Sequence, residues 1–81
     1  MPRRKWLINA RKARKYTQGD VAHKVEISQS AYADYELGKK NPLGGTAYLI
    51  SRLLDFRMER FYEDDERLQS ILIKIGLPVW R

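Results

Sequence analysis

The chain has 81 residues, a hydrophobic fraction of 43% and nine aromatic side chains, which favours one small folded domain with at most a short appendage. It has no cysteine and one histidine, which excludes a disulfide framework and a thiolate metal site, and no apolar run reaches the roughly 18 residues of a membrane span. The net charge of +6 lies within residues 1–40, which hold ten basic and four acidic side chains, whereas residues 41–81 hold six of each. This segregation favours a polyanionic partner.

Helical spacing begins near the N-terminus. Over residues 6–15, Leu7 and Ala10 recur at helical intervals, which predicts a first helix. Thr17 is a favourable N-cap with Asp20 at the third helical position, so we expect a short second helix to begin there. The buried stripe of this helix is expected to consist of Val21, Ala22 and Val25. We expect the lone His23 to face solvent or the rim of a binding surface.

A third helix is predicted after Ser28, the next N-cap, and Gly38 can end it by adopting positive φ. Its inward side chains are expected to be Ala31, Tyr32 and Tyr35. Pro42 suits the first turn of a fourth helix that runs to about Leu54. Its core face is expected to contain Ala47, Ile50, Leu53 and Leu54.

A fifth short helix is expected over residues 58–61, with Phe56 and Phe61 closing the core. The composition then changes, which divides the chain into a domain of residues 1–62 and a C-terminal extension of residues 63–81. The extension opens with four acidic residues, which suit a helix N-terminus because carboxylates interact favourably with the helix dipole.

The apolar residues of the extension allow two interpretations. Four of them fall at positions i, i+3, i+4 and i+7 and predict an amphipathic helix: Leu68, Ile71, Leu72 and Ile75. Three isoleucines also alternate as in a strand that could pair across a two-fold axis: Ile71, Ile73 and Ile75. We favour the helix, and we expect its apolar face to bind a second copy of the chain or another protein.

One pattern links residues 7–62, and the residues that carry it are Leu7, Ala10, Arg11, Thr17, Gln18, Val21, Ala22, Val25, Ile27, Ser28, Gln29, Ser30, Tyr32, Tyr35, Glu36, Gly38 and Pro42. This pattern resembles the helix-turn-helix family of phage Cro and lambda-type repressors, which also includes many bacterial regulators and antitoxins. The resemblance implies an all-α fold, a five-helix lambda-repressor-like bundle that binds double-stranded DNA. It also implies that the chain needs no cofactor.

The resemblance assigns structural roles to two charged residues. Arg11 and Glu36 would form an ion pair that ties the first helix to the end of the third. Glu36 is therefore expected to be structural, neither a base reader nor a catalytic acid. Ala22 has to be small because the second and third helices cross closely there. Tyr35 is expected in the core, whereas the Tyr32 hydroxyl is expected to reach a DNA phosphate.

The third helix would be the recognition helix. Gln29 and Ser30 begin it and are the expected base-edge readers, because glutamine can form two hydrogen bonds with adenine. Ala33 and Asp34 lie one turn further on, where Ala33 could pack on a thymine methyl. Asp34 could accept from cytosine N4, or it could repel phosphate and so set the spacing from the DNA. The alternative for Gln29 and Ser30 is that they are ordinary solvated residues at a helix start.

Contacts with the DNA backbone are expected from three places. Gln18 begins the second helix, where its amide and nearby backbone N–H groups can bind a phosphate. The basic loop after the third helix and an N-terminal arm would add Lys39, Lys40, Asn41, Arg3 and Arg4. For the arm, a disordered N-terminus is an equally good interpretation.

Two positions depart from the family pattern. Glu26 occupies the turn position where glycine is usual, because the backbone there tends to positive φ. Another residue in that region costs about 1 kcal/mol, so the turn would be strained or differently shaped. Gly44 and Gly45 replace the polar residues that are common in the family, which would weaken the first turn of the fourth helix or let the backbone approach a phosphate.

These observations predict a transcriptional regulator, Cro-like in size and of phage or mobile-element type. It would act as a repressor in the cytoplasm of a bacterium or a phage-infected host. A homodimer, formed at least on DNA, would read a palindromic operator in successive major grooves. The alternative is an antitoxin or other partner-binding regulator whose extension docks on a second protein. No catalytic or metal-binding arrangement of residues is evident, so we do not expect an enzyme.

Overall fold

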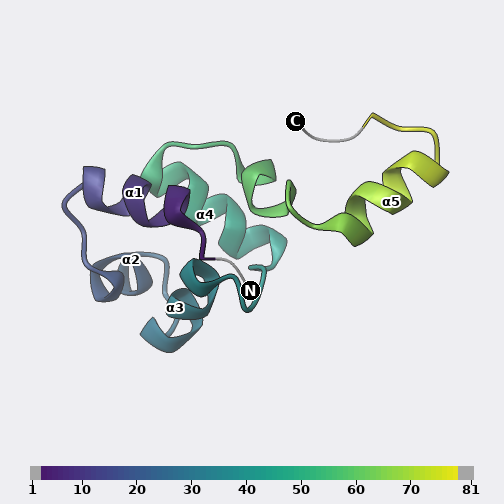
Figure 1. Ribbon diagram of the computed structural model, residues 1–81. Coiled ribbons are helices and arrows are strands. Elements are labelled where there is room, and N and C mark those ends of the chain that lie inside the picture. The colour runs from purple at the N-terminus through teal and green to yellow at the C-terminus, as the bar shows by residue number, and fades with distance from the viewer. Residues whose placement is uncertain (1–2, 79–81) are drawn as a thin grey trace.

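A computed structural model describes residues 3–78 and shows helices only (Figure 1). In chain order the elements are α1 (Lys5–Ala13), α2 (Gln18–Lys24), α3 (Gln29–Leu37), α4 (Gly44–Leu54), the 3₁₀ helix η1 (Met58–Tyr62) and α5 (Glu66–Lys74). No strand occurs in this part of the chain. The all-α fold class is therefore confirmed, and the helical interpretation of the extension holds over the strand.

The predicted caps define α2 and α3. The Thr17 hydroxyl accepts from the Asp20 N–H at 3.0 Å, and the Asp20 carboxylate accepts from the Thr17 N–H at 2.8 Å, which completes a capping box. The Ser28 hydroxyl accepts from the Ala31 N–H at 3.0 Å. Gly38 ends α3 in the left-handed region with φ of 76°. Local side-chain chemistry thus fixes where the two central helices begin and where α3 ends.

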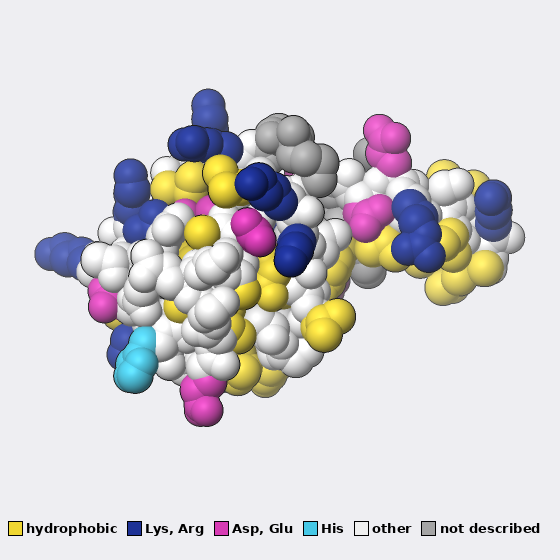
Figure 2. Space-filling view, turned by 90° about the horizontal axis from the view of Figure 1, so that it is seen from below, with side chains coloured by type: hydrophobic (Ala, Val, Ile, Leu, Met, Phe, Trp, Pro, Cys, Tyr) yellow, Lys and Arg dark blue, Asp and Glu magenta, His cyan; other side chains and the backbone are white. Residues whose placement is uncertain are grey.

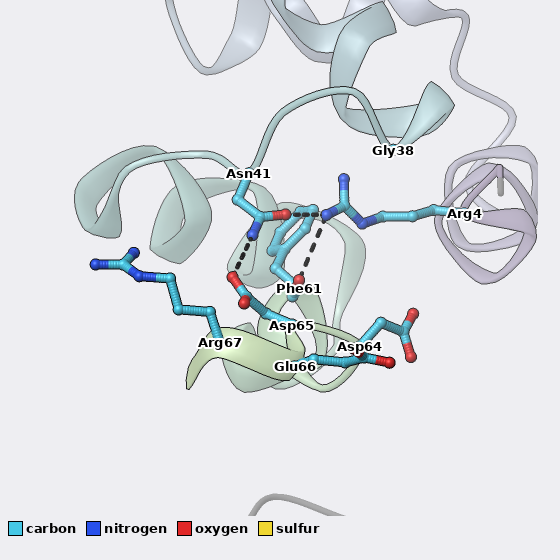
Figure 3. Close-up of a pocket in the computed structure, with 8 residues that line it drawn as sticks. All are labelled: Arg4, Gly38, Asn41, Phe61, Asp64, Asp65, Glu66 and Arg67. Carbon is cyan, nitrogen blue, oxygen red and sulfur yellow. Dashed lines mark hydrogen bonds between the residues drawn. The ribbon is translucent and has the colours of Figure 1, made fainter. Parts of the chain in front are cut away.

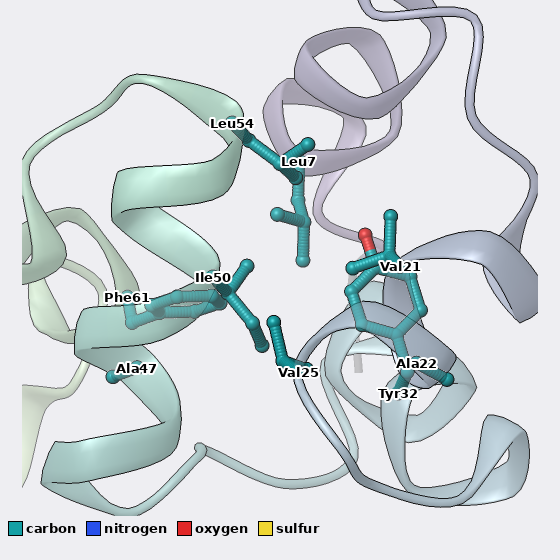
Figure 4. Close-up of a cluster of buried hydrophobic side chains, with 9 residues drawn as sticks. All are labelled: Leu7, Val21, Ala22, Val25, Tyr32, Ala47, Ile50, Leu54 and Phe61. Carbon is teal, nitrogen blue, oxygen red and sulfur yellow. The ribbon is translucent and has the colours of Figure 1, made fainter.

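The core lies where α1, α2, α3, α4 and η1 meet (Figure 4). Its buried side chains are Leu7, Val21, Ala22, Val25, Tyr32, Ala47, Ile50, Leu54 and Phe61. Three aromatic rings close one side with edge-to-face contacts, their centroids 5.0 to 5.4 Å apart: Trp6, Phe56 and Phe61. The core thereby holds α3 by its inner face and leaves its first residues outside. Leu53, predicted as core, is only partly buried at the edge of this cluster.

Two elements differ in detail from the prediction. The fourth helix begins at Gly44, after Leu43 as its N-cap, rather than at Pro42. The short fifth helix is a single 3₁₀ element over Met58–Tyr62. The Tyr62 hydroxyl donates to the Pro42 carbonyl at 2.9 Å, so Pro42 belongs to the loop that η1 braces.

The turn between α2 and α3 passes through Glu26 with φ of 60°, the left-handed conformation that the sequence predicted. The next residue, Ile27, donates its N–H to the Ala22 carbonyl at 3.0 Å, which closes the end of α2. A residue with a Cβ is strained in this region because the Cβ crowds the backbone.

We expect Glu26→Gly to raise the free energy of unfolding by up to about 1 kcal/mol, because glycine adopts positive φ without this strain. Urea denaturation measures the change. Glu26→Ala is the matched control, since it removes the charge but keeps the Cβ. Equal stabilisation by both variants would assign the effect to charge and contradict the backbone argument.

The helix α5 stands apart from the bundle and contributes no buried side chain (Figure 1). Its start is capped by Asp65, whose carboxylate accepts from the Leu68 N–H at 3.2 Å. The helix α5 and the residues that follow it expose four apolar side chains: Ile71, Ile73, Ile75 and Leu77.

The domain boundary at residue 62 stays a prediction. No helix in the described part of the chain has the length and hydrophobicity needed to cross a membrane.

Candidate nucleic-acid interface

The start of α3 is exposed to solvent. Gln29 and Ser30 are both exposed, directly after the Ser28 cap. The Gln29 side chain lies over the first turn of α2, because its Oε1 is 3.2 Å from the position that a Cβ on Gly19 would occupy. Gly19 thus leaves room for this amide. The importance of a glycine at this position was not predicted.

The next turn of α3 is less open. Ala33 and Asp34 are both partly buried. Asp34 lies 3.9 Å from the Lys40 ammonium, with 25% of its side chain exposed against 70% for Lys40. Such a half-exposed pair is a weak contact. It nevertheless places a basic side chain next to the acidic one that was expected to read a base.

A nearly buried ion pair joins α1 to α3. The Arg11 guanidinium donates to both carboxylate oxygens of Glu36, at 2.6 and 3.2 Å, and the two side chains are only 12% and 3% exposed. Arg11 also donates to the Tyr16 carbonyl at 3.0 Å. The Gln18 amide donates to Glu36 at 2.9 Å, so α2 joins the same network. Glu36 therefore holds the first three helices together.

The protonation of this network follows from its contacts. Burial alone would raise the pKa of Glu36, but the hydrogen bonds from Arg11 and Gln18, together with the nearby Tyr32 hydroxyl, hold the pKa below its ordinary value. The hydrogen bond to Glu36 is the main reason that the pKa of Arg11 is raised. The pair is therefore fully ionised at neutral pH.

The phosphate contact expected of Tyr32 is wrong. Its side chain is fully buried, so the hydroxyl does not reach the surface. The hydroxyl lies beside Glu36 without a hydrogen bond of normal geometry. Burial first, and then the neighbouring carboxylate, raise the pKa of the phenol. Tyr32 is a core residue, which agrees with its predicted place on the inward face of α3.

The N-terminal arm is also corrected at Arg4 (Figure 3). Its guanidinium is not free, because it donates to the carbonyls of Tyr35, Lys40 and Phe61 at 2.6, 3.0 and 3.4 Å. It also donates to the side-chain oxygen of Asn41 and lies over the Phe61 ring, 5.5 Å from its centroid. Arg4 therefore fastens the N-terminal segment to the end of α3 and to η1.

The side chains of the loop after α3 differ in the contacts that they make within the protein. Lys39, Lys40 and Asn41 are all exposed. The Asn41 amide nevertheless contacts two residues, Arg4 on one side and the Asp65 carboxylate at 3.3 Å on the other (Figure 3). The two lysines are thus the part of the loop best placed to meet a polyanion.

Figure 2 shows the molecule from the side on which α2 and α3 lie. Lys and Arg side chains stand at the upper and left edges of this face, and others lie nearer its middle beside an acidic side chain. His23 is exposed on α2, as expected. Among residues 3–78, no group of three or more His, Cys, Asp or Glu side chains could hold a metal ion.

Comparison with known proteins shows similarity over the part of the chain that contains α2 and α3. A family model described as "Helix-turn-helix" matches residues 7–61. The chain is also similar to the "Uncharacterized HTH-type transcriptional regulator YqaE" of Bacillus subtilis (strain 168), with 40% identity over 53 residues, which is 65% of this chain. The chain spans less than half of that relative, 46% of its length. No solved structure matches the chain at a comparable level of significance.

Proposed function

The chain belongs to the helix-turn-helix family, and from that premise we propose that it is a transcriptional regulator that binds double-stranded DNA through the start of α3. The family match confirms the resemblance on which the sequence prediction rested. The relative is named as a transcriptional regulator, which supports this role and not that of an enzyme.

One observation carries this proposal: α3 is fixed at its inner face and open at its first turn. Tyr32 and Glu36 are buried and held by the core and by the network from α1 and α2. Gln29 and Ser30 project from the same helix into solvent. A rigid helix with exposed polar residues at its N-terminus is the geometry that places side chains against base edges in a major groove.

Contacts with the DNA backbone would come from residues on either side of α3. The Gln18 amide uses one N–H on Glu36 and has a second N–H for a phosphate. Lys39 and Lys40 at the other end of the helix are exposed. Arg3 is exposed as well, whereas Arg4 and Asn41 support the domain through each other.

We propose further that two copies bind a palindromic operator, as in a Cro-like repressor of phage or mobile-element type. The support is the predicted apolar stripe of the extension, none of whose residues is buried in the core: Leu68 and Leu72 are partly buried, and Ile71 and Ile75 are exposed. A symmetric dimer would place its two recognition helices about 34 Å apart, one turn of the double helix.

Selection of bound sequences from a random pool of double-stranded DNA tests this function. We expect enrichment of one motif with two symmetric half-sites, bound with an affinity that falls steeply as salt rises. A single half-site would contradict the dimer and leave DNA binding intact. Failure to enrich any motif would contradict the regulator.

That last outcome would favour the alternative function, a partner-binding regulator or antitoxin. The observation that favours this alternative is the apolar surface of the extension. Besides the residues of the predicted amphipathic helix, Ile73 and Leu77 are 68% and 54% exposed there. A surface of this kind is suited to a protein partner. The same selection experiment therefore separates the two functions.

A further inference from the structure

A hollow of about 390 Å³ lies between α1 and α3, beside the start of α2. Arg3 and Lys12 line it together with Gln18 and Ala33, and the Arg11–Glu36 pair also contributes to its wall. Lys12 is not among the residues that the sequence predicted to contact DNA. The structure brings it together with residues from three other segments.

The charge of this hollow is positive. Arg11 and Glu36 neutralise each other through their two hydrogen bonds. Neither Arg3 nor Lys12 has an ion-pair partner among residues 3–78. Two cations therefore face the hollow without a compensating anion, which favours an anionic occupant.

The hollow is also continuous with the proposed base-reading surface. Ala33 lies three residues after Ser30 and four after Gln29, so the three residues share one side of α3. The small Ala33 side chain leaves space where a larger one would reduce the hollow. Gln18 adds an amide N–H, a donor that phosphate oxygens accept.

We propose that this hollow binds a phosphate of the DNA strand that runs alongside α3, with Lys12 and Arg3 as its cationic contacts. The inference rests on the proposed DNA-binding function and adds Lys12 to the interface. A lysine that neutralises one phosphate releases about one counterion, so its contribution is measurable from the salt dependence of binding.

The test is the salt dependence of binding to the selected operator and to random duplex DNA for Lys12→Gln. We expect the slope of log K against log salt to become shallower by about 0.9 for both DNAs, with about five-fold weaker binding at low salt. Arg52→Gln is the charge-matched control, because Arg52 is exposed in the last turn of α4 and does not line this hollow. Lys12→Arg keeps the charge and should retain the wild-type slope.

The outcomes separate this inference from the function beneath it. If Lys12→Gln changes the slope no more than Arg52→Gln while the wild-type protein binds its operator, the phosphate site is wrong and the regulator stands. If the wild-type protein binds neither DNA, the proposed function fails and the site fails with it. Circular dichroism of each variant checks that the helical fold is retained, so a lost contact is distinguished from a lost fold.

Discussion

Replacing Glu36 by alanine is expected to lower the free energy of unfolding by about 3 kcal/mol, because Arg11 is left nearly buried without its counter-charge. The Gln18 amide loses its acceptor at the same time. Glu59→Ala is the matched control, since it breaks an ion pair with Arg57 in which both side chains are exposed. Urea denaturation should show a large shift for the first variant and little change for the second.

The effect of Glu36 also has a predictable pH dependence. Because its pKa is lowered in the folded protein, its contribution is fully present above the unfolded value of about 4.3 and is lost as the pH falls through the folded pKa. The stability difference between wild type and Glu36→Gln should therefore be constant near neutral pH and shrink in acid. A stability difference that grows in acid would contradict the ionised pair. Glu36→Gln also provides a measurement of the role of Glu36 if the alanine variant does not fold.

Gln29→Ala is expected to reduce sequence discrimination by about 1–3 kcal/mol. Discrimination here is the difference in binding free energy between the operator and a site altered at the base pair that Gln29 reads. Gln29 is exposed at the start of α3, and its side chain lies over Gly19. Lys40→Ala, by contrast, should weaken binding to all sequences and reduce the salt slope by about 1. Binding titrations on operator, altered operator and random DNA measure both effects.

A charged residue outside the proposed DNA and dimer surfaces serves as the control for these titrations. Arg52→Ala removes one positive charge from the last turn of α4 and should leave the discrimination unchanged. Equal losses on operator and random DNA for Gln29→Ala would contradict a base contact. A sequence-dependent loss for Lys40→Ala would contradict a contact to the DNA backbone alone.

The helix boundaries could be predicted from the sequence because they depend on neighbours along the chain. Thr17 and Ser28 bind N–H groups three residues away, and Gly38 needs only its own backbone freedom. The left-handed turn at Glu26 was predicted from the family pattern for the same reason. Such features require no knowledge of how the helices pack.

The role of Arg4 and the position of the Tyr32 hydroxyl could not be predicted, because both depend on contacts with distant parts of the chain. Arg3 and Arg4 are adjacent and chemically alike, yet the partners of Arg4 are 31 to 57 residues away in the sequence. The Tyr32 hydroxyl could in principle have emerged from α3, and packing alone decides that it does not. Nothing in the local pattern of Lys12 indicates that it shares a hollow with Ala33.

Within residues 3–78, three helices are followed by a residue other than glycine in the left-handed region: Lys15 after α1, Glu26 after α2 and Asp55 after α4, each with φ of 60°. Glycine at each of these positions would raise the free energy of unfolding by up to about 1 kcal/mol, because it adopts positive φ without strain. The domain therefore lies below the highest stability that its own backbone permits. Proteins need only exceed the threshold that their function requires. Glycine substitutions in these three turns could therefore offset the stability lost through mutations in the DNA-binding surface, without a change to the core.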